Sequence, residues 1–139
     1  MKRILFFLSL MCITLSSYAK PATIEGVLKM YYIDVYGDGK VVKTYQETDW
    51  YNTYLAFVIE PSKPFDVRPY VSASELEDVP PMQRQFMIYP NFKNLTARAF
   101  AQKYANKRVR VTGTLYVPGG GWRNMTEVVI DMDKIELVK

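Results

Sequence analysis

Alternating apolar and polar side chains predict β-strands along much of the chain. In residues 22–32, Ile24, Leu28 and Met30 alternate with polar neighbours, and residues 108–117 alternate without a break. Gly26, inside the first of these strands, predicts a bulge or a sharp bend. Apolar runs between turn signals predict further strands at 41–45, 53–59, 85–89, 127–132 and 134–138.

One segment has helical rather than strand periodicity. Residues 96–105 are rich in alanine, Asn94 is a candidate N-cap, and Asn106 is a candidate stop. The apolar positions, spaced i, i+3, i+4, i+7, are Ala97, Phe100, Ala101 and Tyr104.

The order of these elements predicts the fold class. We expect a mainly β protein, a small OB-like barrel of five to six strands with one α-helix between the third and fourth main strands. An SH3-like or other small open barrel is the alternative. Residues 65–81 contain Pro69, Pro80 and Pro81 and an acidic stretch at 75–78, and we interpret them as a long flap outside the core.

The first nineteen residues have the three-part layout of a secretory signal peptide. Lys2 and Arg3 precede an apolar run at 4–15 that is too short for a permanent membrane anchor, and Ser17 and Ala19 are small residues before a cleavage site. We therefore expect export through the Sec route.

The expected mature chain is a single domain, residues 20–139, outside the cytoplasm. Cys12 follows Leu10 and Met11 rather than a small residue, so we expect no lipid anchor. Removal of Lys2 and Arg3 from the 18 basic residues leaves 16 against 14 acidic residues, a net charge of +2. Such a weak charge does not provide the positive surface that binding to a phosphate backbone requires, so we expect no nucleic-acid partner.

Composition excludes several kinds of chemistry. The sequence has no histidine, and its single cysteine lies in the expected signal peptide. A mature protein without these residues has no disulfide, no thiol nucleophile, no serine–histidine triad and no zinc site of the usual ligands. We expect no cofactor, no metal and no enzymatic activity. Survival outside the cytoplasm without a disulfide favours a bacterial periplasm or medium.

Charged residues near the C-terminus have a structural interpretation and a functional one. Lys107, Arg108 and Arg110 could bind phosphate, but cross-strand pairing with acidic residues is simpler; the candidate partners are Glu127, Asp131 and Glu136. Asp131 and Asp133 would share one face of an ideal strand, where a carboxylate pair could do acid–base chemistry or simply mark an exposed strand edge.

The C-terminal third resembles a known family. Residues 107–115 (KRVRVTGTL), 128–131 (VVID) and 134–137 (KIEL) are similar to the bacterial secreted proteins catalogued as domain of unknown function 4431. The resemblance implies an exported OB-like domain and does not indicate any particular activity. The turn that is often rich in histidine in that family is here Gly119–Trp122, so no histidine or metal role is implied.

Aromatic residues provide the candidate binding surface. Trp50, Tyr51 and Tyr54 cluster in and after a polar segment, and Trp122 follows a glycine turn. Some aromatic rings belong to the core, but rigid aromatic side chains with polar tips are also typical anchors of interfaces.

Two functions remain open from the sequence. The first is a non-catalytic binding module that holds a protein, an envelope glycan or a small ligand through Trp50, Tyr51, Tyr54 and Trp122. The second is an inhibitor or immunity protein that blocks a periplasmic toxin or hydrolase with the acidic stretch at 75–78.

Overall fold

A computed structural model describes residues 20–34, 41–42, 53–90, 95–119 and 125–139. Within these residues strands dominate and a single helix lies between the β6 and β7 strands, so the prediction of a mainly β fold with one helix is confirmed. The elements are β1 (Ala22–Asp34), β2 (Val41–Val42), β3 (Thr53–Pro61), β4 (Phe65–Asp66), β5 (Met82–Gln83), β6 (Phe86–Tyr89), α1 (Ala97–Tyr104), β7 (Arg108–Tyr116) and β8 (Val129–Leu137).

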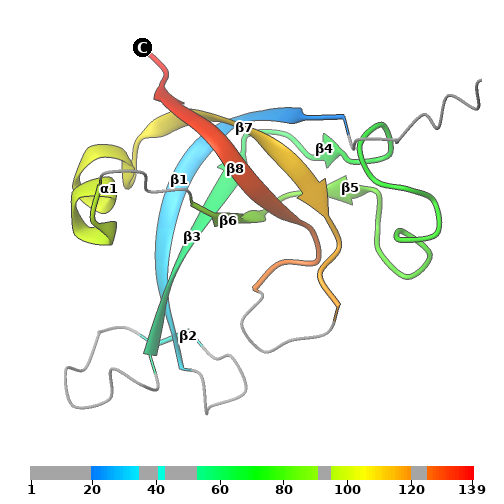
Figure 1. Cartoon of the computed structure of the whole chain (residues 1–139), viewed down its shortest axis with the longest axis horizontal. Helices are drawn as coiled ribbons and strands as arrows, with labels where there is room; N and C mark the ends of the chain where they lie inside the picture. Colours follow the sequence, from blue (N-terminus) through cyan, green and yellow to red (C-terminus); the bar gives the residue numbers. More distant parts are fainter. Residues whose placement is uncertain (1–19, 35–40, 43–52, 91–94, 120–124) are drawn as a thin grey trace, which may run out of the picture.

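The pairings of the large sheet form a ring, because its last strand, β7, also pairs with β1. The large sheet has the order β2-β1-β3-β6-β8-β7, and β1 also pairs with β7 (Figure 1). The β6–β8 pair is parallel and the other pairs are antiparallel. β4 and β5 form a separate two-stranded sheet.

β1 pairs with β7 and β3 over different parts of its length. Its residues Ala22 to Val27 pair with β7, and its residues Gly26 to Asp34 pair with β3. At Gly26, where both pairings overlap, an added Cβ would collide with the backbone of Glu60 and Pro61. Glycine is therefore required at position 26 because β3 lies so close. The sequence predicted a bulge or a sharp bend here, and the structure shows a close contact with the backbone of the neighbouring strand.

A second glycine marks an irregularity between β7 and β8. Thr112 is opposite Lys134 and Gly113 is opposite Met132, so Asp133 is an extra residue on β8. The prediction of two separate closing strands was wrong, since one strand continues through this bulge. Met132 is buried between the exposed Asp131 and Asp133, and the alternation of buried and exposed residues ends after Asp133.

The main core lies on one side of the sheet and is closed by the helix. Most of its buried residues come from β1, β3, β6, β7 and β8, and α1 contributes Phe100 and Tyr104. Thr96 Oγ1 accepts a hydrogen bond from Ala99 N at 3.1 Å, so Thr96 is the N-cap, where Asn94 was expected; Asn94 lies outside the described residues. Asn106 has φ 59° and its N–H donates to Leu28 O at 2.7 Å, which confirms the predicted helix stop.

The segment at 65–81 is not the free flap that its prolines suggested. Val67 and Val71 are buried in the main core, and Leu76 and Val79 pack against it. Val67 N donates to Pro81 O at 2.9 Å, which ties the start of the segment to its end. The prediction was wrong because the apolar residues here are spaced irregularly and match neither helix nor strand periodicity.

Ion pairs cross from β1 to β7 and β8. Glu25 binds Arg108 at 2.9 Å and Arg110 at 3.2 Å, and Arg110 also reaches Glu136 at 3.5 Å. The hydrogen bonds from Arg108 and Arg110 lower the pKa of Glu25. The expected pairing with Glu136 is confirmed, but the principal acidic partner is Glu25, on a strand far away in the sequence.

The bulge predicts a sharp difference between two glycines. An added Cβ at Gly113 would collide with the carbonyl group of Asp131 on the paired strand, whereas Gly119 has open space around it. Gly113→Ala should lower the free energy of unfolding by about 2 kcal/mol or more, as overpacking against backbone does. Gly119→Ala should leave it within about 0.5 kcal/mol. Urea denaturation of both variants measures the difference; equal stabilities would contradict this close approach of β7 and β8.

Candidate functional site

Four tyrosines gather on the side of the sheet opposite the main core. They are Tyr31 of β1, Tyr54 of β3, Tyr89 of β6 and Tyr116 of β7, and we call this surface the tyrosine face. All four are half-buried. They pack against a second cluster of buried residues, which are Ile33, Ala56, Val58, Met87 and Val129.

Strand register explains why these side chains share one side. Val58 is opposite Met87, Met87 is opposite Val129, and Val129 is opposite Tyr116, so one row crosses four strands. Tyr31 is opposite Ala56. The small alanine leaves room for the phenol ring to lie over the sheet, which contributes to the burial of the apolar row beneath.

Tyr31 is fixed at its polar end. Its Oη donates to Glu60 Oε1 at 2.8 Å, and Gln85 Nε2 donates to the same oxygen at 3.1 Å. Burial raises the pKa of Tyr31, and the hydrogen bond to Glu60 and the carboxylate charge raise it further. The phenol therefore stays protonated at neutral pH and acts as a hydrogen-bond donor.

Tyr89 and Tyr116 form a stacked pair. Their ring centroids lie 6.2 Å apart with an interplanar angle of 14°. Burial raises the pKa of Tyr116, with smaller contributions from Tyr89 and from the charge of Asp131. Asp131, considered from the sequence as half of a catalytic pair, thus acts electrostatically on the tyrosine face.

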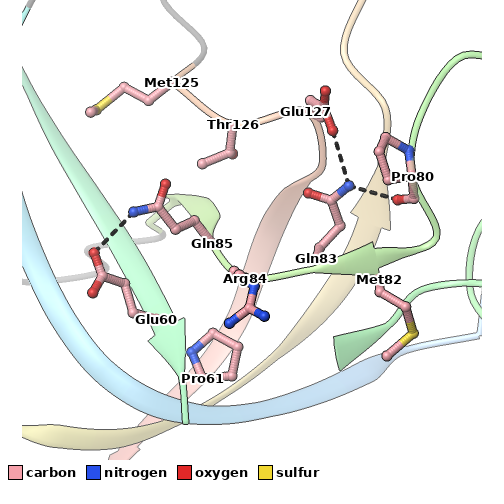
Figure 2. Close-up of a pocket in the computed structure, with 10 residues that line it drawn as sticks. All are labelled: Glu60, Pro61, Pro80, Met82, Gln83, Arg84, Gln85, Met125, Thr126 and Glu127. Atoms are coloured by element: carbon pink, nitrogen blue, oxygen red, sulfur yellow. Dashed lines mark hydrogen bonds between the residues drawn. The ribbon is translucent and has the colours of Figure 1, made fainter. Parts of the chain in front are cut away.

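A polar pocket of about 600 Å³ adjoins the tyrosine face (Figure 2). Its lining comes from the end of β3, from the β5–β6 region and from the residues that precede β8. The lining residues are Glu60, Pro61, Pro80, Met82, Gln83, Arg84, Gln85, Met125, Thr126 and Glu127. Two of these residues connect the pocket to the tyrosine face: Glu60 accepts a hydrogen bond from Tyr31, and Met125 packs against the same buried cluster as the four tyrosines.

Charged groups of both signs surround this pocket. Figure 2 shows the Glu60–Gln85 pair on one side and, on the other, Gln83, whose Nε2 donates to Glu127 Oε2 at 3.1 Å and to Pro80 O at 2.7 Å. Arg84 is exposed and forms no ion pair within the described part of the chain. The pocket therefore offers carboxylate acceptors, amide groups and one guanidinium.

Thr126, one of the residues that line the pocket, is held against the sheet by two hydrogen bonds. Its buried Oγ1 accepts from Met87 N at 2.8 Å and donates to Val128 O at 2.8 Å. These bonds fix the residues before β8 beside β6, where Met125 can contact the apolar cluster.

The structure describes the position of one of the four predicted site residues. Tyr54 lies on the tyrosine face, whereas Trp50, Tyr51 and Trp122 lie outside the described residues. The other three members of the tyrosine face, Tyr31, Tyr89 and Tyr116, were not among the predicted site residues.

A sequence signal for this second apolar side did exist. Residues 53–59 are apolar without alternation, as is typical of a strand covered on both faces, and β3 indeed contributes to both clusters.

Comparisons with known proteins found no match to a family model, to a curated protein or to a solved structure. The family resemblance of the C-terminal third stays a prediction. Within the described ranges, no helix has the length and apolar character needed to cross a membrane. The same residues contain no group of three or more side chains suited to hold a metal ion.

The two hydrogen bonds of Thr126 can be tested by substitution. Thr126→Val should lower the free energy of unfolding by about 2 kcal/mol or more, because it leaves Met87 N–H and Val128 C=O buried without their partner. Thr126→Ser, which keeps the hydroxyl, should recover most of this loss. Thermal unfolding of the two variants measures it, and a valine variant as stable as the serine variant would contradict the hydrogen bonds described.

Proposed function

We propose that this protein is an exported, non-catalytic binding module that holds its ligand on the tyrosine face and in the adjoining pocket. The observation that carries the proposal is the gathering of four half-buried tyrosines from four strands over one buried apolar row. Tyrosine rings provide large, rigid contact areas, and their hydroxyl groups add hydrogen bonds, which is why they anchor many interfaces.

We also propose that the ring of β1, β3, β6, β8 and β7 is an OB barrel. The helix between the third and fourth long strands and the parallel pairing of β6 with β8 support this assignment. OB barrels bind ligands over the face of their second and third strands and the loops beside it. In this chain those strands are β3 and β6, which carry Tyr54 and Tyr89.

The predicted tryptophans fit the same surface. Trp50 and Tyr51 precede β3 in the chain, and Trp122 lies between β7 and β8. In an OB barrel these two connections flank the ligand face. The proposed site therefore combines Trp50, Tyr51, Tyr54 and Trp122 with the tyrosines of neighbouring strands.

The chemistry of the surface favours a protein or an envelope glycan as the ligand. Flat rings, neutral phenol donors and the amide groups of the pocket suit both. Glu60, Glu127 and Asp131 place negative charge near the site, which opposes a phosphate backbone. Export through a signal peptide at residues 1–19 would bring the module to the bacterial periplasm or medium.

A capture experiment with matched variants tests this function. The tagged chain is exposed to envelope and secreted extracts and, separately, to a panel of envelope glycans, with bound material identified by mass spectrometry. Tyr54→Thr and Tyr89→Thr should each weaken capture by roughly thirtyfold, the effect of losing an aromatic anchor. Tyr70→Thr is the control, because Tyr70 stacks on Phe65 beside the main core rather than on the tyrosine face.

Circular dichroism must first show that each variant is folded. Capture of every ligand by Tyr54→Thr and Tyr89→Thr as efficiently as by the unchanged chain would contradict the site.

The inhibitor function is the second candidate, and the acidic segment supports it. Glu77 and Asp78 are exposed, while Leu76 and Val79 pack on the core beside them, so these charges are presented on an anchored segment. Because Val67 and Val71 of this segment are part of the core, charge reversal is a better probe than deletion. In the same capture experiment, loss of a protein partner with Glu77→Lys and Asp78→Lys, but not with the tyrosine variants, would favour inhibition.

A further inference from the structure

A second cavity, of about 640 Å³, lies between α1 and the strands β1 and β3. Its lining residues are Met30, Tyr32, Leu55, Arg98, Ala101 and Gln102. None of them belongs to the tyrosine face or to the polar pocket, so this is a separate site.

Strand alternation places this cavity on the other side of the sheet from the tyrosine face. Tyr32 is opposite Leu55 in the β1–β3 pair, and the next pair along is Ile33 with Tyr54. Ile33 and Tyr54 belong to the second cluster, whereas Leu55 and Met30 pack against the main core. The two surfaces therefore share strands but use alternate residues.

The geometry of β1 explains why a hollow exists here. β7 covers β1 only as far as Val27, while β3 continues beside β1 to Asp34. The β1–β3 ribbon thus extends past the ring of strands, as Figure 1 shows. On the cavity side this part of the ribbon presents methionine, leucine and a tyrosine ring.

The helix supplies the opposite wall. Arg98, Ala101 and Gln102 are spaced i, i+3, i+4, so they form one flank of α1, beside the flank that buries Phe100 and Tyr104. The short side chain of Ala101 leaves space between α1 and the two strands. Arg98 and Gln102 are exposed and line the side of the cavity that is open to solvent.

The helix wall of this cavity carries only positive charge, while the acidic Asp34 lies at the next alternate position of β1 beyond Tyr32. The sequence of α1, ARAFAQKY, contains no acidic residue. Arg98 forms no ion pair with any residue in the described ranges. An arginine beside an apolar hollow is complementary to a molecule with an apolar body and an anionic head, since guanidinium binds carboxylate or phosphate through paired hydrogen bonds.

We propose that this cavity binds a single-chain amphiphile with an anionic head, its acyl chain against Met30 and Leu55 and its head at Arg98. Ligand pockets of this size are commonly lined by apolar side chains, with a few polar groups that fix orientation. Barrel mouths are a frequent position for such pockets.

Dodecanoate is the probe, and dodecyltrimethylammonium is its charge-reversed counterpart with the same chain. Isothermal titration calorimetry of the chain, below the micelle concentration of either compound, should show one dodecanoate per protein with a Kd of roughly 100 µM or tighter. Dodecyltrimethylammonium should bind at least about tenfold more weakly, because Arg98 repels its head.

Three variants locate the site. Arg98→Gln should weaken dodecanoate binding about tenfold, and Ala101→Leu should do the same by filling the cavity while it preserves helix propensity. Lys103→Gln removes the other positive charge of α1, whose ammonium lies over the Tyr104 ring outside the cavity, and should leave binding unchanged.

The proposal is overturned by absent dodecanoate binding, by equal binding of the two amphiphiles, or by equal effects of Arg98→Gln and Lys103→Gln. If Ala101→Leu does not fold, the comparison between Arg98→Gln and Lys103→Gln decides. Tyr89→Thr should leave dodecanoate binding intact, so failure here and failure of the tyrosine face can be told apart.

Discussion

The double pairing of β1 is the constraint on which the rest of the structure depends. One continuous strand holds β7 on one edge and β3 on the other, and the two contacts overlap at Gly26 and Val27. At Gly26 the backbone of β3 comes so close that an added Cβ would collide with Glu60 and Pro61. A side chain at position 26 would therefore push β3 away from β1 at the point where β1 also pairs with β7.

The length of β1 also produces the two candidate surfaces. Its first half builds the closed part of the sheet, where Glu25 pairs with Arg108 and Arg110. Its second half projects with β3 as a ribbon with two apolar sides. One side carries Tyr31 toward the tyrosine face, and the other side carries Met30 and Tyr32 toward the cavity under α1. The tyrosine face and the cavity therefore both depend on the pairing of β1 with β3.

Much of the fold could be predicted from local patterns. Alternation located β1 and β7 to within a few residues, and the spacing of Phe100 and Tyr104 located the helix. The failures have a common physical origin, because each depends on contacts between segments distant in sequence. The burial of Val67, the bulge at Asp133 and the choice of Glu25 as the arginines' partner are set by tertiary packing.

The candidate site was less predictable than the fold. Tyr54 was identified because it lies in an aromatic cluster of the sequence, while Tyr89 and Tyr116 come together only through the pairings of β6 with β8 and of β8 with β7. The unbroken apolar run of β3 indicates burial on both sides, but it does not indicate what covers the second side.

The most direct test of this account is the set of interstrand NOEs along β1 in the isotope-labelled chain. We predict contacts from residues 22–27 to β7, contacts from Gly26 onward to β3, and both sets at Gly26 and Val27. Contacts from β1 to β3 alone would mean an open sheet, and would contradict both the ring of strands and the surfaces proposed to depend on it.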